Sequence, residues 1–197
     1  MTYLVTGGAG FIGSNIVETL LKRGEKVRVL DDFSTGKRGN LSFDIKATVE
    51  VIEGDIRDLG TCQRAVKNVR FVLHHAALGS VQRSVEDPLS THEINLKGTL
   101  NMLLASRDGG VKRFVYASSS SVYGDQADEG TAAGDPEFVS PKTERMTPDL
   151  FRPMRRANWP ENFIADFSAI STGSERFRCD TSMSLAKGRT RNRSMPR

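Results

Sequence analysis

Residues 5–14 read VTGGAGFIGS, and this stretch decides the fold. It joins the apolar run TYLVT to a segment, 11–23, whose apolar residues recur with the spacing of a helix. Gly7, Gly10 and Gly13 therefore occupy a turn between a strand and a helix. In such a turn the first glycine permits a tight bend, the second lets the backbone approach a pyrophosphate, and the third lets the helix pack close to the sheet. Because the amides at the start of a helix favour an anion, the stretch predicts a phosphate-binding turn.

The rest of the front part of the chain alternates strand and helix patterns. Further strands are predicted at 26–32, 48–53, 69–74 and 113–117, and further helices at 58–68 and about 87–108. This alternation favours an α/β fold with a doubly wound, parallel (Rossmann) sheet. We expect residues 1–124 to form the cofactor-binding domain and residues 125–144 a loop. Residues 145–197 show neither the helical nor the strand period, so we expect an irregular, disordered basic tail and a sheet truncated after five strands.

An acidic residue at the end of the second predicted strand favours one dinucleotide cofactor over another. Asp31 lies 18 residues past Gly13, where a carboxylate binds the 2′-hydroxyl of an adenosine ribose. This position favours NAD, since the carboxylate repels the 2′-phosphate of NADP. Lys37 and Arg38 follow closely and keep NADP open as the alternative.

Composition excludes several classes of protein. No apolar run reaches 18 residues, so we expect no membrane span, and the N-terminus has no secretory signal pattern. Two cysteines, Cys62 and Cys179, make no disulfide framework, which favours the cytoplasm. The net charge of +4 comes from residues 145–197, which hold 11 of the 28 basic residues and 5 of the 24 acidic ones. No aromatic groove pattern accompanies this charge, so we expect no nucleic-acid partner.

Two adjacent histidines could be taken for metal ligands. His74 and His75 are neighbours at the end of a predicted strand, so their side chains face opposite sides of the sheet. The sequence places no third ligand at metal spacing near them. We therefore expect packing or capping roles for both, and no metal site.

Six motifs in one order carry a family resemblance. VTGGAGFIGS, LDDFSTGK, EGDIRD, HHAA, NLKGT and YASSSSVYGD together resemble the extended short-chain dehydrogenase/reductase superfamily, of the NAD-dependent epimerase/dehydratase type. Within it the chain looks like the UDP-hexose 4-epimerases, and LGSVQRSVEDP resembles the branch that acts on UDP-N-acetylglucosamine or its relatives. The resemblance covers residues 1 to about 124. It implies NAD as cofactor, a UDP-sugar substrate and reversible oxidation of the sugar at C4.

The resemblance also implies roles for individual residues. Phe11 and Ile12 would lie along the pyrophosphate, Asp31 would hold the ribose, and Asp55 with Ile56 would frame the adenine. The full set assigned to the cofactor is Gly7, Gly10, Phe11, Ile12, Gly13, Asp31, Asp32, Phe33, Ser34, Gly36, Asp55, Ile56, Ala76, Ala77, Leu78 and Asn95. The set assigned to the substrate is Ser80, Arg83, Ser119, Ser120 and Ser121.

The serine run separates two possible reactions. When the motif is aligned on VYG, Ser119 corresponds to the family's serine that hydrogen-bonds the sugar 4-hydroxyl. It is the one catalytic residue that the resemblance assigns here. Related nucleotide-sugar 4,6-dehydratases have an acid/base pair where this chain has Ser120 and Ser121. Two serines do not supply that elimination chemistry at neutral pH, so the epimerase is favoured. Arg83 is a candidate for a substrate phosphate, with a solvated surface role as its alternative.

The catalytic pair of the superfamily is missing. In SPYxxSK a tyrosine deprotonates the sugar 4-hydroxyl, and a lysine four residues later lowers its pKa. None of the three tyrosines, Tyr3, Tyr116 and Tyr123, has a lysine four residues later. Loss of a general base typically costs about 10²–10⁴ in rate, so we expect an inactive chain. Two further readings stay open: a non-catalytic NAD-binding module, and a front domain that does not fold stably.

The stretch FRPMRRANW at 151–159 suggests why the pair is missing. Permitted codons for residues 148–167, read from the third base of the first codon, encode GSLSPYAASKLAGELYCRL, which contains SPYAASK. The same shift over residues 175–196 gives AFPLRYFNVFGQGQDPESQYA, which resembles a later segment of the same family. PKTE at 141–144 still matches the family, so the hypothesis is a frameshift near Glu144. The alternative is a divergent tail with its own role. The family homodimer uses a helix just after SPYxxSK, which leaves that dimer in doubt here.

Overall fold

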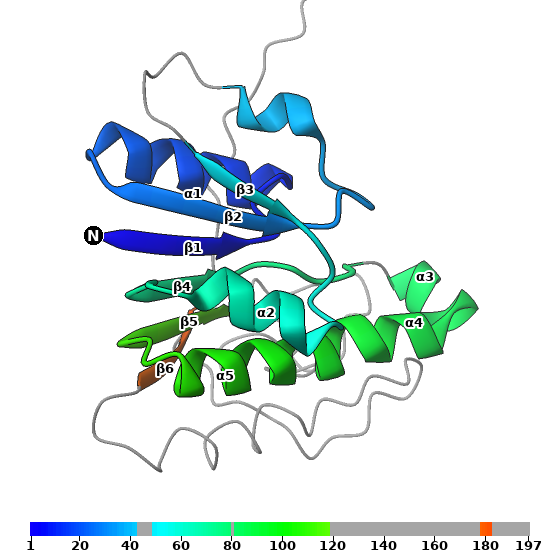
Figure 1. The fold of residues 1–197 in the computed structure, drawn as a ribbon. Helices are drawn as coiled ribbons and strands as arrows, with labels where there is room; N and C mark the ends of the chain where they lie inside the picture. Colours follow the sequence, from blue (N-terminus) through cyan, green and yellow to red (C-terminus); the bar gives the residue numbers. More distant parts are fainter. Residues whose placement is uncertain (43–48, 80, 119–177, 183–197) are drawn as a thin grey trace, which may run out of the picture.

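A single parallel sheet forms the centre of the protein (Figure 1). The computed structural model describes residues 1–42, 49–79, 81–118 and 178–182. The sheet has six strands in the order β3-β2-β1-β4-β5-β6, and every neighbouring pair is parallel. The strands are β1 (Thr2–Thr6), β2 (Lys26–Asp31), β3 (Glu50–Glu53), β4 (Phe71–His74), β5 (Arg113–Ala117) and β6 (Arg178–Ser182). The order reverses between β1 and β4, which is the switch point where doubly wound sheets bind ligands.

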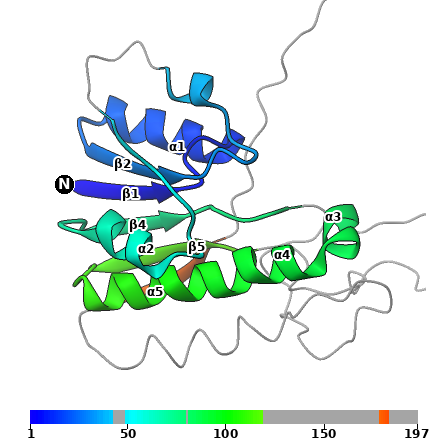
Figure 2. The same cartoon turned by 45° about the vertical axis from the view of Figure 1, so that its right-hand side comes forward.

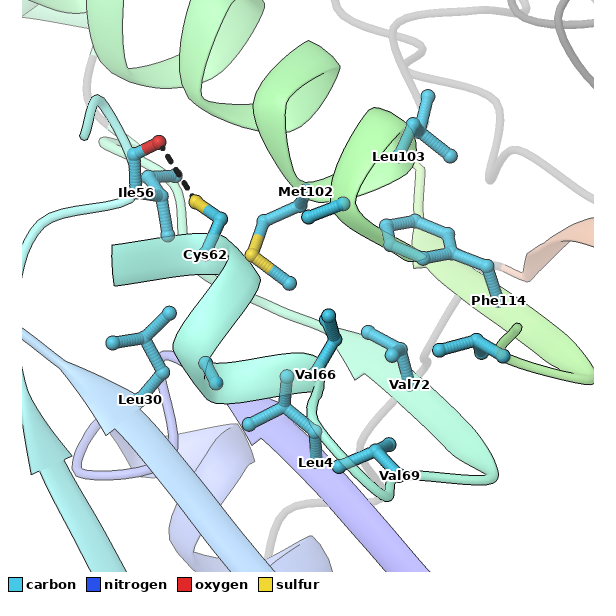
Figure 3. Close-up of a cluster of buried hydrophobic side chains, with 13 residues drawn as sticks. Leu4, Leu30, Ile56, Cys62, Val66, Val69, Val72, Met102, Leu103 and Phe114 are labelled. Carbon is cyan, nitrogen blue, oxygen red and sulfur yellow. Dashed lines mark hydrogen bonds between the residues drawn. The ribbon is translucent and has the colours of Figure 1, made fainter. Parts of the chain in front are cut away.

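Helices cover both faces of this sheet. One face is covered by α1 (Phe11–Lys22), and the other by α2 (Leu59–Val66) and α5 (Thr99–Asp108). The short helices α3 (Val81–Glu86) and α4 (Pro88–His92) lie beyond the carboxyl ends of the strands, and a 3₁₀ turn, η1 (Arg38–Leu41), follows β2. Alternate residues of β1 serve the two faces: Val5 packs with Val17 of α1, whereas Leu4 packs with residues of α2 and α5. The hydrophobic cluster that contains Leu4, shown in Figure 3, joins Val66 of α2 to Met102 of α5. The doubly wound parallel fold expected from the sequence is confirmed.

The helix expected at about 87–108 is present, with a π-helical segment in its middle. Figures 1 and 2 show α4 and α5 along one continuous helical rod, and a π-helical segment, η2 (Glu93–Gly98), lies between them. A Cβ on Gly98 would lie 2.6 Å from Ile56 Cδ1, so glycine permits the close approach of this segment to the strand ends. Side-chain periodicity carries no signal for such a π segment.

The sheet does not end at the fifth strand. Residues 178–182, within the region expected to be irregular, form β6 beside β5. The sequence RCDTS has no apolar alternation, and the register sets Arg178 opposite Arg113, so nothing in the pattern predicts this strand. The expectation of a sheet that ends after five strands was therefore wrong.

Within the described residues, every helix is too short or too polar to cross a bilayer.

Candidate functional site

A cleft opens at the carboxyl ends of β1, β2, β4 and β5, at the switch point of the sheet. Its volume is about 360 Å³. Its lining is Gly7, Gly10, Phe11, Ile12, Gly13, Leu30, Asp31, Asp32, Ser34, Thr35, Gly36, Gly54, Asp55, Ile56, His75, Ala76, Ala77, Leu78, Ile94 and Ala117. The cleft therefore collects the turn after β1, the segments that follow β2, β3 and β4, and the last residue of β5.

The glycine turn leaves no room for side chains. Gly7 has φ +65°, and a Cβ there would lie 2.8 Å from the Ala76 nitrogen. A Cβ on Gly13 would lie 2.1 Å from the Gly7 carbonyl oxygen, so α1 can pack this closely against the turn only with glycine. These contacts place backbone amides, rather than side chains, on the wall of the cleft.

The start of α1 is suited to an anion. Gly10 is the N-cap and has no side chain that could bind the first amides of the helix. The first turn carries no acidic residue, so no carboxylate competes with a bound phosphate. Phe11 and Ile12, in that turn, line the cleft although both are exposed apolar side chains. A diphosphate fits this cradle.

Asp31 is buried at the end of β2, and both of its carboxylate oxygens accept backbone hydrogen bonds. Ala9 N–H donates to Oδ2 and Phe33 N–H donates to Oδ1, each at 2.8 Å. Phe33 reaches this position with φ 57°, in the left-handed region. The carboxylate thus ties the glycine turn to the loop after β2 and is fixed before any ligand binds.

Asp55 lies at another end of the cleft, and Arg57 holds it. Arg57 donates to Asp55 from its backbone N–H and from Nε, each at 2.7 Å. Burial opposes ionisation of Asp55, but the hydrogen bonds and charge of Arg57 outweigh it and lower the carboxyl pKa below 3.8. Arg57 also reaches Glu93 at 3.6 Å. The carboxylate is therefore ionised and oriented at neutral pH.

Comparison with known proteins identifies the family of this chain. The model of the NAD dependent epimerase/dehydratase family matches residues 3–145, which include the glycine turn, Asp31 and Asp55. The chain belongs to this family. Members of the family use NAD, so the predicted cofactor is confirmed for the family.

Individual relatives are nucleotide-sugar enzymes. UDP-glucose 4-epimerase of Erwinia amylovora is 36% identical over 168 residues, which are 80% of this chain and 50% of the relative. Among solved structures, UDP-glucose 4-epimerase of Thermus thermophilus in complex with NAD has a TM-score of 0.71 at 36% identity, over 92% of this chain and 54% of that one. dTDP-glucose 4,6-dehydratase of Streptomyces venezuelae with NAD bound has a TM-score of 0.61 at 38% identity, over 65% and 42%. The chain spans about half the length of the two epimerases.

The epimerase/dehydratase cleft contains most of the residues assigned to the cofactor. All of them line it except Phe33 and Asn95. Phe33 contributes its backbone N–H to Asp31. Asn95, on η2, binds the backbone of Leu78 twice: its Oδ1 accepts from Leu78 N at 2.7 Å and its Nδ2 donates to Leu78 O at 3.0 Å. Asn95 therefore braces a wall of the cleft from behind.

The residues assigned to the substrate are not brought together in the described part of the chain. Ser80, Ser119, Ser120 and Ser121 lie outside the described residues. Arg83 is exposed on α3 and is not among the residues that line the cleft. Figure 1 shows α3 beyond the carboxyl ends of the strands, on the same side as the cleft.

Sequence reasoning missed several residues of the lining: Leu30, Thr35, Gly54, His75, Ile94 and Ala117. Leu30, Thr35 and Gly54 stand inside the motifs LDDFSTGK and EGDIRD, so the motifs as whole segments could have identified them. For His75 the sequence predicted a packing or capping role, not a place in the lining of the cleft. Among the described residues no group of three or more His, Cys, Asp or Glu side chains could hold a metal ion.

Proposed function

We propose that this chain is the NAD-binding half of a UDP-hexose 4-epimerase and that, as written, it has negligible epimerase turnover. One observation carries the choice of NAD: Asp31 is fixed by two backbone amides at the edge of the cleft. A Cβ on Gly36 would lie only 2.9 Å from Asp31 Oδ1, so backbone surrounds the carboxylate closely. A fixed anion in this position accepts a ribose hydroxyl and repels a 2′-phosphate.

The position of the serine run supports a sugar beside the cofactor. Ala117, the last residue of β5, lines the cleft, and Ser119 follows it by two residues in the sequence. Bound NAD would take a hydride from the sugar and return it. The residues of this chain would bind the dinucleotide through the glycine turn and orient its ribose through Asp31.

The lack of a tyrosine with a lysine four residues later supports the proposed inactivity. The two tyrosines within the described residues are packed in the sheet: Tyr3 against Phe71 at 5.0 Å between ring centroids, and Tyr116 against His74 at 5.9 Å. Neither lines the cleft. The same observation favours the second candidate function, a non-catalytic NAD-binding module. A 4,6-dehydratase is the third, supported by the dehydratase relative and opposed by Ser120 and Ser121.

Calorimetric titration with NAD and NADP tests the cofactor proposal. We expect the unaltered chain to bind NAD more tightly than NADP, and D31N to weaken NAD binding by roughly 10–100-fold, because a charge-assisted hydrogen bond is lost. The matched control is D108N. Asp108 is exposed at the end of α5, accepts a hydrogen bond from Arg107 Nε and is not among the residues that line the cleft, so its variant should bind NAD almost as the unaltered chain does. Equal losses in D31N and D108N would contradict the proposal.

Turnover separates the candidate functions. We expect no conversion of UDP-glucose to UDP-galactose, nor of the corresponding UDP-N-acetylhexosamines, by the NAD-loaded chain. Conversion at ordinary enzymatic rates would contradict the proposed inactivity. A change in affinity for a protein partner when NAD binds would instead favour the non-catalytic module.

A further inference from the structure

A buried chain of hydrogen bonds runs behind the cleft. Thr99 Oγ1 donates to Asn95 O at 2.6 Å, and His74 Nε2 lies 3.0 Å from Thr99 Oγ1. On the other side of the ring, His74 Nδ1 lies 2.7 Å from Thr6 Oγ1. Thr6, His74 and Thr99 are each at most 1% exposed. Four elements, β1, β4, η2 and α5, are thus connected by one row of polar groups.

The donors and acceptors in this row permit a single arrangement of protons. The Thr99 hydroxyl proton is committed to a carbonyl, which only accepts, so His74 Nε2 must carry a proton and donate it to Thr99 Oγ1. In a neutral imidazole Nδ1 is then bare, and it accepts from the Thr6 hydroxyl. Thr6 Oγ1 uses its remaining capacity to accept from the backbone N–H groups of His75 and Ala76, each at 3.2 Å. Every hydroxyl in the row has one donated and at least one accepted bond.

The two ends of the row hold the same wall of the cleft. Thr6 binds the amides of His75 and Ala76, and Asn95 binds both backbone groups of Leu78. The segment between these anchors, 75–78, lines the cleft and lies directly against the glycine turn at Gly7. Because both this segment and the glycine turn line the cleft, a shift of the segment changes the surface that the cleft offers to a dinucleotide.

We propose that His74, held as its neutral Nε2–H tautomer between Thr6 and Thr99, is a positioning residue that fixes segment 75–78 and thereby sets the affinity for the dinucleotide. The inference rests on the proposed binding of NAD. An Nδ1–H tautomer or an imidazolium would point a third donor at Thr6 Oγ1 and leave the Thr6 proton without its acceptor. Either change weakens the bonds from the backbone N–H groups of His75 and Ala76 to Thr6 Oγ1. His75 N–H also donates to the Thr6 carbonyl oxygen at 3.1 Å, so the Ala76 amide is the more affected of the two.

The surroundings of His74 keep it in this state. Its ring lies 5.4 Å from that of Phe114 and 5.9 Å from that of Tyr116, in the apolar interior of the sheet. Burial, with a smaller contribution from the charge of His75, lowers the pKa of His74 to about 3. The row therefore stays intact throughout the neutral range.

Paired variants of Thr99 test the inference. T99V keeps the shape of the side chain but removes both the donor and the acceptor, and we expect it to raise the Kd for NAD roughly tenfold. T99S keeps the hydroxyl and should stay close to the unaltered chain. The matched control is S106A on the same helix: Ser106 is fully buried, and its hydroxyl has no hydrogen-bond partner among the described residues. S106A should leave the Kd unchanged even if its melting temperature shifts.

A second measurement probes the row of hydrogen bonds directly, in the chain without NAD. In ¹⁵N NMR spectra we expect His74 with a protonated Nε2 and a bare Nδ1 across the neutral range, and slow hydrogen exchange of the Ala76 amide that accelerates in T99V and in T6V. An Nδ1–H tautomer, or a T99V Kd equal to that of S106A while the unaltered chain binds NAD, would overturn the inference alone. Absence of NAD binding by the unaltered chain would overturn the proposed function, and with it the link from His74 to affinity.

Discussion

His74 commits both ring nitrogens to threonine hydroxyls, and this makes the stability of the protein depend on pH. Its pKa is about 3 in the folded chain against an ordinary 6.5. Below about pH 6.5 this histidine is therefore protonated in the unfolded chain but stays neutral in the folded chain. As the pH falls, the free energy of unfolding decreases by about 1.4 kcal/mol per pH unit until the folded pKa is reached. Between about pH 7 and pH 5 we expect a loss of about 2 kcal/mol from this group, measured by urea unfolding.

Two histidine variants isolate this contribution. H74Q cannot titrate and should show a smaller loss of stability between the same two pH values, whatever its absolute stability. H92Q removes an exposed histidine at the end of α4 and should keep the slope of the unaltered chain. Burial lowers the pKa of His75 as well, so H74Q should retain part of the slope. Equal slopes for H74Q and the unaltered chain would contradict the assignment.

At the scale of elements, α1 packs closely against the glycine turn because Gly13 has no Cβ atom. In G13A the new Cβ would lie 2.1 Å from the Gly7 oxygen and 2.7 Å from Gly8 Cα, and both are backbone atoms that cannot rotate away. We expect a loss of about 1–3 kcal/mol or more in the free energy of unfolding, together with loss of NAD binding. G39A is the control, because a Cβ there meets nothing within 4 Å and should change stability by less than about 0.5 kcal/mol. Similar effects of the two variants would contradict this account.

The sixth strand offers a second test at this scale. Asp180 and Thr181 stand opposite Val115 and Tyr116 of β5. Adjacent residues of a strand alternate in direction, so replacing both in D180P/T181P removes whichever amide bonds to β5. We expect faster hydrogen exchange at those β5 amides that do not pair with β4, while Val51 and Ile52 in β3 keep their protection. Unchanged exchange throughout β5 would mean that β6 does not protect this edge in solution.

The elements that the sequence predicts are those with a local signal. The glycine turn, the apolar strands β1, β2 and β4, and the helix after Gly10 follow from period and turn chemistry. The π segment does not, because it depends on contacts between Asn95 and Leu78 and between Gly98 and Ile56, which lie far apart in sequence. The sequence motifs also identified most of the residues that line the cleft. The row behind it was not predicted, since its threonines and His74 meet only after β1, β4 and α5 have packed.

At the scale of the whole molecule, β6 bears on the frameshift hypothesis. Of the residues Arg178–Ser182 only Thr181 is of a type enriched in strands, yet the segment pairs along the whole of β5. In the displaced frame the codons of these five residues contribute to the letters LRYF of AFPLRYFNVFG, which carry two aromatic residues. Aromatic residues are enriched in strands, whereas Asp is depleted in them. The place of β6 in the sheet thus supports our proposal that an encoded strand has been read in the wrong frame.

Restoring the frame tests this proposal on the whole protein. The gene should be sequenced from about codon 120 onward, and the displaced frame should encode SPYAASK across the codons of residues 148–167. A gene corrected by the required shift near codon 144 should then yield a product that epimerises a UDP-hexose, at a rate about 10²–10⁴ or more above that of the present chain, because the general base returns. Replacing the tyrosine of SPYAASK with phenylalanine in that product should remove the gain while NAD binding persists, since the glycine turn and Asp31 are unchanged. Codons that exclude SPYAASK would contradict the hypothesis, and residues 145–197 would then have to be explained as a sequence with a role of its own.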